Sequence, residues 1–253
     1  EANWNDGSCT YPDNGDYSLS FDGDGDYTDF GGHIVPAGAK TISAWIYLDE
    51  TNTKDRFILS DNMVDYFFYY NNNVELRFIN TADDNHLEYT IDLRDNNWHH
   101  VAYTFDNTTQ KLYHNGEEVA SNQGANITIS DSNYDRIAYS REGDEDECWL
   151  GSIDELSIWN NALTTEEIQF NMYNELSGSE EGLVGYWKFN SGSGTTLFDH
   201  SKNGNHGTIY EAKWLYEHNL IDGNNLISLP GTPENDDSQY LGNTMDSPVF
   251  ILG

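Results

Sequence analysis

Residues 148–160 read Cys-Trp-Leu-Gly-Ser-Ile-Asp-Glu-Leu-Ser-Ile-Trp-Asn, which has the composition of a strand. Two further motifs precede this run, Phe-Asp-Gly-Asp-Gly-Asp-Tyr at 21–27 and Asn-Trp-His-His-Val-Ala at 97–102. From about residue 16 to residue 160, short alternating runs are separated by Asn, Asp and Gly. Antiparallel strands joined by tight turns produce this pattern. The sequence therefore predicts an all-β sandwich or barrel rather than alternating helices and strands.

Individual segments support this fold class. The run 41–48 alternates, with Ile42, Ala44, Ile46 and Leu48 on one face. The runs 101–105 and 110–114 are separated by a short polar turn and predict a hairpin, and Asn115-Gly116 predicts a type I′ turn into the next strand.

One short amphipathic helix is predicted in addition to the strands. Thr164-Thr165-Glu166-Glu167 has the form of a capping box, and Ile168, Met172 and Leu176 follow it at intervals of four residues. We expect this apolar stripe to cover the edge of the sandwich.

The charge of the chain excludes some classes of partner. Only 11 Lys and Arg residues stand against 44 Asp and Glu residues, so the formal net charge is -33. Nucleic acid and anionic membranes are bound by clustered basic residues, so neither is expected as a partner. No apolar run is long enough to insert into a membrane. The acidity fits either a solvated surface or clusters that bind divalent cations.

Taken in their order along the chain, the three motifs resemble the laminin-G-like jelly-roll family of the concanavalin A-like lectin/glucanase superfamily, to which pentraxins are related. The resemblance implies a two-sheet antiparallel jelly-roll sandwich. Domains of this family mostly bind ligands, often through calcium, and some relatives are enzymes.

The resemblance also predicts the domain organisation. Residues 182–214 look like the opening strands of the family, which normally precede the Phe-Asp-Gly motif. We expect them to complete a sandwich spanning 16–214 as a circular permutation, although a second sandwich beginning at about 182 is the alternative. Residues 1–15 then form the end of an upstream Cys-containing repeat or an N-terminal arm, and 215–253 a linker or the start of another module.

A calcium site is predicted where the family motifs meet. The loop Asp22-Gly23-Asp24-Gly25-Asp26 supplies carboxylates and flexible backbone carbonyls, which are ligands that calcium prefers. The alternative is a polar turn that holds no ion. Carried over from the family, the predicted ligands are Asp22, Gly23, Asp26, Asp154, Asp199 and Asn203.

A second acidic segment is a candidate for ligand binding. Residues 142–147 contain the Glu-x-Asp-x-x-Glu spacing of retaining β-glucanases, but the intervening residues have loop composition. We interpret the segment as a solvated acidic loop. It also resembles, loosely, the loop in which pentraxins gather calcium-binding carboxylates, which nominates Asp144, Asp146 and Glu147.

Aromatic residues offer another kind of contact. The run 66–70 is Tyr-Phe-Phe-Tyr-Tyr, and an exposed ring such as Tyr69 would stack on a sugar; core packing is the alternative. In the Trp-His-His motif, Trp98 is expected in the core, and His99 and His100 point to opposite faces of a strand.

The two cysteines, Cys9 and Cys148, have no partners at metal-site spacing. Either they form a disulfide with each other, or Cys9 pairs with a cysteine upstream of this sequence.

These observations predict a non-catalytic, calcium-stabilised adhesion or carbohydrate-binding module of a larger exported or cell-surface protein. Its partner would be an extracellular glycan or a surface protein. A structural subunit that associates with copies of itself is the alternative, followed by a glycoside hydrolase. No nucleophile elbow, phosphate-binding loop or zinc-protease helix is present, so no enzyme is predicted.

Overall fold

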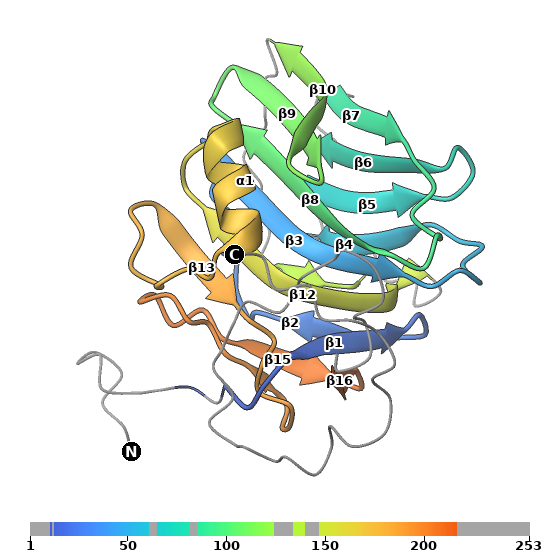
Figure 1. The fold of residues 1–253 in the computed structure, drawn as a ribbon, viewed down its shortest axis with the longest axis vertical. Helices are drawn as coiled ribbons and strands as arrows, with labels where there is room; N and C mark the ends of the chain where they lie inside the picture. Colours follow the sequence, from blue (N-terminus) through green and yellow to red (C-terminus); the bar gives the residue numbers. More distant parts are fainter. Residues whose placement is uncertain are drawn as a thin grey trace, which may run out of the picture.

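Two antiparallel sheets pack face to face and enclose one hydrophobic core (Figure 1). The computed structural model describes residues 11, 13–60, 65–80, 85–123, 134–139 and 147–216. The first sheet has the order β10 (Glu117–Gln123), β9 (Thr109–His114), β8 (Trp98–Phe105), β3 (Lys40–Leu48), β12 (Leu150–Trp159), β1 (Tyr17–Asp22), β16 (Lys213–Tyr216), with β13 (Leu183–Trp187) also paired to β12. The second has the order β14 (Thr196–Leu197), β15 (Gly207–Tyr210), β2 (Tyr27–Asp29), β11 (Arg136–Ile137), β4 (Arg56–Ser60), β5 (Asp65–Tyr70), β6 (Glu75–Asn80), β7 (Asn85–Thr90). The predicted two-sheet jelly-roll sandwich is therefore confirmed.

The strand β12 occupies the centre of the first sheet. One of its edges pairs with β3 along most of its length. The other edge is shared, because β1 pairs with its first half and β13 with its second half. The motif at 148–160 thus forms the strand on which three others align.

The alternation of apolar residues along β3 decides which face of the sheet meets the core. Ile42, Ala44, Ile46 and Leu48 are buried in the core as predicted. Trp45, on the opposite face, is buried as well, because Met172 of the helix packs against it.

Local turn and capping signals also hold in the structure. Asn115 and Gly116 both have positive φ, as a type I′ turn requires, and connect β9 to β10. The helix α1 (Thr165–Tyr173) has the predicted capping box, in which Thr164 and Glu167 exchange side-chain to backbone hydrogen bonds. Leu176 lies beyond the end of the helix, so the stripe is shorter than predicted.

The helix covers the outer face of the first sheet rather than its edge. Ile168 packs with Tyr113 and Trp159, which project from β9 and β12. In Figure 1 the helix lies in front of β8 and β3. No helix in the described part of the chain is long and apolar enough to cross a membrane.

The last described strands belong to the same two sheets as the first ones. β13 pairs with β12, β15 with β2 and β16 with β1, so residues 183–216 add strands to both sheets. β16 extends to Tyr216, two residues past the predicted boundary. The backbone N–H of Asn14 also donates to Asn190. Whether this order is a permutation of the family order stays a prediction.

Gly151 is the position in β12 where the backbone requires glycine. Its φ is 138°, and a Cβ there would overlap the carbonyl oxygen of Tyr47 on β3. We predict that Gly151→Ala lowers the free energy of unfolding by ~3 kcal/mol or more, because both strain and overlap oppose the native pairing. Gly194 also has positive φ, but open space surrounds it, so Gly194→Ala should cost only ~1–2 kcal/mol. Urea unfolding measures both, and equal losses would contradict the close contact of β12 with β3.

Candidate functional site

A row of tyrosines lies across the outer face of the second sheet. Tyr27 on β2 and Tyr210 on β15 are paired in register, and their rings stack with centroids 4.6 Å apart at an interplanar angle of 15°. Their neighbours Thr28 and Ile209 are buried on the other face of the same strands. Strand alternation therefore turns both tyrosines away from the core.

Arg136 on β11 extends this row. Its guanidinium lies 4.9 Å from the ring centroid of Tyr27, 4.7 Å from that of Tyr139 and 4.1 Å from that of Tyr134. Its Nε donates to the carboxylate of Asp29 at 2.8 Å. These contacts hold the arginine between aromatic faces, where cation–π attraction adds to the ion pair.

Tyr210 is the open end of the row. It keeps 44 % of its surface exposed, whereas Tyr27, Arg136 and Tyr139 are partly buried. Burial raises the pKa of Tyr27, so its hydroxyl stays protonated at neutral pH. The row thus presents the exposed ring of Tyr210 at one end, stacked on Tyr27, which in turn lies against the Arg136 guanidinium. We call Tyr27, Asp29, Arg136, Tyr139 and Tyr210 the tyrosine row.

The structure corrects the placement of Tyr69. Its side chain is 0 % exposed and belongs to the core, where its hydroxyl donates to Asp92 at 3.4 Å. A ring in that position cannot stack on a ligand. Its neighbours Phe68 and Tyr70 face the other way, and the guanidinium of Arg77 lies 4.0 Å from the Tyr70 ring centroid.

The predicted calcium ligands lie in separate groups. In the first group, the Asp26 carboxylate accepts from the backbone N–H of Asp22 at 2.7 Å, and its other oxygen is buried without a hydrogen-bond partner. Burial raises the pKa of Asp26 to about 6. The carbonyl of Gly23 accepts from Arg56 at 3.2 Å. In this loop, Asp26 therefore keeps one carboxylate oxygen that can still accept a contact.

The second group is satisfied by its own loop. The Asp199 carboxylate accepts four hydrogen bonds, from the backbone N–H groups of Tyr186, Ser201 and Asn205 and from the Ser201 hydroxyl. The Asn203 amide donates to the carbonyls of Leu183 and Val184. These two residues therefore hold the loop against β13 without needing an ion.

Asp154 belongs to neither group. It is buried on β12, where its carboxylate accepts from the backbone N–H of Glu155 at 2.8 Å. Within the described ranges, no three His, Cys, Asp or Glu side chains are grouped closely enough to hold a metal ion. The set of six predicted ligands is not brought together.

Other predicted residues lie partly or wholly outside the described ranges. Cys9, Asp144 and Asp146 are outside them. Glu147 is described and partly buried, and Cys148 is buried, with its carbonyl accepting from Arg56 at 2.6 Å. The Cys9–Cys148 disulfide and the acidic-loop site stay predictions.

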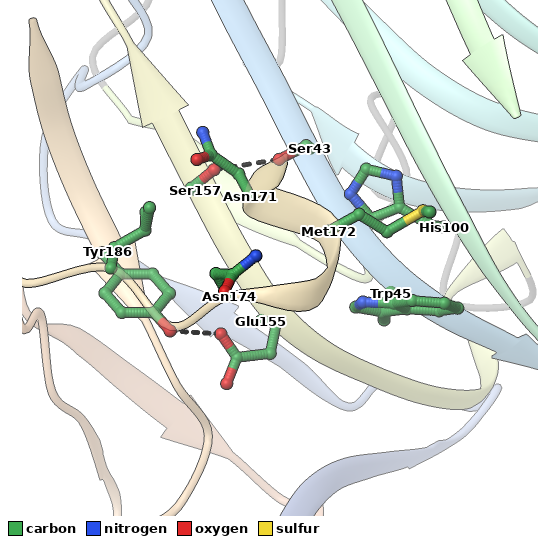
Figure 2. Close-up of a pocket in the computed structure, with 10 residues that line it drawn as sticks. Ser43, Trp45, His100, Glu155, Ser157, Asn171, Met172, Asn174 and Tyr186 are labelled. Carbon is green, nitrogen blue, oxygen red and sulfur yellow. Dashed lines mark hydrogen bonds between the residues drawn. The ribbon is translucent and has the colours of Figure 1, made fainter. Parts of the chain in front are cut away.

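A pocket lies on the opposite side of the sandwich, between α1 and the first sheet (Figure 2). Its cavity volume is about 20 Å³, which accommodates a group the size of a water molecule or an ammonium. Its lining residues come from β3, β8, β12, α1, the segment after α1 and β13: Ser43, Trp45, His100, Glu155, Ser157, Asn171, Met172, Asn174, Leu176 and Tyr186.

A β-bulge places Glu155 in this pocket. Asp154 pairs with Trp45 and Ser157 with Ser43, so two residues of β12 face one residue of β3. Glu155 has a φ of 49°, a conformation that few non-glycine residues adopt. Without the bulge, alternation would turn Glu155 toward the core, like Ile153. The bulge turns it outward instead, where the Tyr186 hydroxyl donates to it.

Burial changes the protonation of two groups in the pocket. It raises the pKa of Glu155 to about 7, against the lowering effects of the Tyr186 hydrogen bond and of Lys188. It lowers the pKa of His100 to about 3, with His114 as a smaller cause. His100 is therefore neutral at physiological pH, and its Nδ1 has no hydrogen-bond partner.

The family follows from a comparison of the sequence with known families. The model of the concanavalin A-like lectin/glucanases superfamily, of the laminin-G type, matches residues 22–169. The chain belongs to this superfamily. No curated protein matches the chain.

Several solved structures share the fold. A candidate carbohydrate binding protein from Bacteroides ovatus is 20 % identical with a TM-score of 0.66; the match covers 79 % of this chain and 60 % of that protein. A pentraxin of the SAP type from Limulus polyphemus is 20 % identical with a TM-score of 0.51, over 64 % of this chain and 83 % of that one. The sialidase CBM40 of Ruminococcus gnavus, solved with α2,3 sialyllactose, is 19 % identical with a TM-score of 0.50. The match covers 60 % of this chain and 95 % of that one.

Sequence reasoning missed most of both sites in this superfamily member. It selected Asp154 from the Ile-Asp-Glu motif, whereas the adjacent Glu155 enters the pocket. It did not select Tyr27, Arg136 or Tyr210, although Tyr27 ends the Phe-Asp-Gly motif. The position of Tyr27 at the end of that motif is the one sequence signal that points to the tyrosine row.

The buried histidine predicts a pH dependence of stability. The pKa of His100 is lower in the folded state than the unfolded value of about 6.5, so the unfolded chain binds more protons between about pH 6.5 and pH 3. Stability from this group is therefore present above pH 6.5 and lost as the pH falls through that window, by at most ~1.4 kcal/mol per pH unit.

We predict that His100→Gln flattens this slope in urea unfolding between pH 7 and pH 5. His86→Gln, at an exposed position of β7, is the matched control and should leave the slope unchanged. Equal slopes in all three proteins would show that His100 is not buried in its neutral form.

Proposed function

We propose that the chain is a non-catalytic carbohydrate-binding module, and that a sugar ring stacks on Tyr210 at the open end of the tyrosine row. The observation that carries the proposal is the exposure of this ring at the end of the stack, where it rests on Tyr27. A pyranose has an apolar face of C–H groups and a rim of hydroxyls. A flat exposed ring complements the apolar face, and its hydroxyl is a polar group for the rim.

The row is organised before any ligand arrives. The Tyr210 ring rests on Tyr27, which in turn contacts Arg136 and Tyr139. Stacked neighbours restrict the rotation of each side chain, so little conformational entropy is lost on binding. Rigid tyrosines are effective contact residues for this reason.

The charges of the row favour a neutral sugar. Arg136 is paired with Asp29, which also accepts from the backbone N–H of Gly31 at 2.7 Å. The arginine is therefore already neutralised, and the net charge of -33 repels acidic glycans. The names of the Bacteroides ovatus and Ruminococcus gnavus proteins support glycan binding in general by similarity of fold, and the acidic sialyllactose of the second gives no support for a neutral sugar.

The environment of Asp29 supports binding without catalysis. Glycoside hydrolysis uses a carboxylic acid with a raised pKa and a second carboxylate. Both carboxylate oxygens of Asp29 are instead already engaged, one by the Arg136 guanidinium and one by the backbone N–H of Gly31. We propose an adhesive role within a larger exported or cell-surface protein, with an extracellular glycan as the partner.

Calcium remains part of the proposal at one loop. Asp22, Gly23 and Asp26 precede β2, which carries Tyr27 of the row. The unpartnered, buried oxygen of Asp26 supports a cation there, since a charged oxygen without a partner is costly. Asp199 and Asn203 do not fit, because their polar atoms are already bonded. An ion bound at this loop would hold the start of β2, and with it Tyr27, in place.

The sugar contact is tested at Tyr210. We predict that Tyr210→Ala weakens binding of neutral glycans at least tenfold, because the stacking face is removed. Tyr173 on α1, which is 59 % exposed on the other face of the sandwich, supplies the control Tyr173→Ala, which should bind normally. A glycan array followed by calorimetry measures the difference. The proposed function is wrong if the wild-type chain binds no neutral glycan. It is also wrong if both variants lose binding equally.

The calcium part is tested by thermal melting with calcium and then with a chelator. We predict that calcium raises the melting temperature of the wild-type chain and that Asp26→Asn abolishes the increase. Asp24→Asn, in an exposed position of the same loop, should retain it. A chelator that leaves the wild-type melting temperature unchanged excludes a calcium at this loop.

A further inference from the structure

Polar side chains line the pocket beneath α1, and two of them keep an atom without a hydrogen-bond partner among the described residues. His100 is 4 % exposed, and its Nδ1 accepts and donates nothing. Of the described residues, only Tyr186 is hydrogen-bonded to the Glu155 carboxylate, which leaves its second oxygen available. Figure 2 shows Glu155, His100 and the amides of Asn171 and Asn174 around the same space. Buried polar groups without partners are costly, which indicates a polar ligand.

The charge around the pocket is negative. The lining contains the carboxylate of Glu155 and no Lys or Arg. Asp13 and Asp16 lie close enough to raise the pKa of Glu155. The nearby cation is Lys188, and it is paired with Glu175 and with Asp13. A positively charged ligand group would therefore be attracted, and an anion repelled.

The apolar part of the pocket suits a cation as well. Trp45 forms one wall, with Met172 beside it (Figure 2). An indole face attracts an ammonium group, and the attraction increases when both are removed from water. An ammonium has three N–H donors, and the second oxygen of Glu155 and the Asn174 amide oxygen are acceptors for them.

We propose that this pocket binds the primary ammonium group of an unacetylated amino sugar. The ammonium contacts the Glu155 carboxylate and the Trp45 face, and the amides of Asn171 and Asn174 contact the sugar hydroxyls. The sugar part of this inference rests on the proposed function. The pocket and the tyrosine row lie on opposite faces of the sandwich, so they are separate sites that can engage two sugars at once.

The proposal is tested by titrating the full chain with glucosamine, glucose and N-acetylglucosamine at neutral pH, by calorimetry or NMR. Glucosamine should bind saturably and at least tenfold more tightly than the other two sugars, which lack the ammonium. Nα-acetyl-lysine amide carries an ammonium without a sugar and should bind more weakly than glucosamine.

Two variants assign the binding to the pocket. Glu155→Gln and Asn171→Ala should each weaken glucosamine binding, the first at least tenfold. Glu118→Gln changes the net charge equally at an exposed position of β10, and it should leave the affinity within twofold of wild type. Asn171 is a partly exposed helix residue, so its variant keeps the test meaningful if Glu155→Gln alters the fold.

Three results would overturn the inference. Glucose and glucosamine could bind equally, the lysine amide could bind as tightly as glucosamine, or Glu155→Gln could leave the affinity unchanged. Tyr210→Ala separates this inference from the proposed function. Loss of glucosamine binding in Tyr210→Ala but not in Glu155→Gln would place the amine at the tyrosine row, which contradicts the pocket site and leaves carbohydrate binding intact.

Discussion

The pairing of β12 with three other strands is the constraint on which the molecule depends. β3 lies along one edge of β12, and β1 and β13 divide the other edge between them. Gly151 allows the backbone of β12 to approach Tyr47 closely, and the Trp149 indole N–H donates to the same Tyr47 carbonyl at 3.2 Å. Segments that lie far apart in the sequence, at 17–22, 40–48 and 183–187, therefore meet at one strand.

The same strand connects the fold to one of the binding sites. The bulge after Asp154 adds one residue to β12, and the sheet continues on both sides of it. Because the bulge reverses the alternation, Ile153 and Leu156 both face the core and Glu155 projects outward. The strained φ of Glu155 is maintained by the pairing of the flanking residues. A polar group thus enters a pocket without weakening the core beneath it.

The two faces of the sandwich differ in chemistry. On the second sheet, the tyrosine row is open, and its arginine and aspartate neutralise each other. On the first sheet, α1 covers the surface and leaves a pocket lined by one carboxylate, that of Glu155, and by no Lys or Arg. An open ring suits the face of a neutral sugar, whereas a covered acidic pocket suits a compact cation. Under these proposals, the tyrosine row binds a neutral sugar and the pocket binds an amino sugar, on opposite faces of the sandwich.

Local signals in the sequence were sufficient for the fold class and several elements. The alternation in β3, the capping box at Thr164 and the Asn115-Gly116 turn depend on neighbours a few residues apart, so they could be predicted directly. Tyr69 shows the limit: composition indicated an aromatic strand, but only the register of the sheet decided that Tyr69 faces the core.

The sites were decided by tertiary structure, because their residues come from distant strands. Tyr27, Arg136 and Tyr210 are far apart in sequence, and strand order alone brings them together. The hydrogen bonds that satisfy Asp199 likewise come from β13 and from its own loop, which no motif specified. The sequence by itself determined a two-sheet sandwich with one helix, since its period and turns are local. Which side chains are exposed, partnered or left with a free polar atom depended on contacts between strands, and only the folded chain decides those.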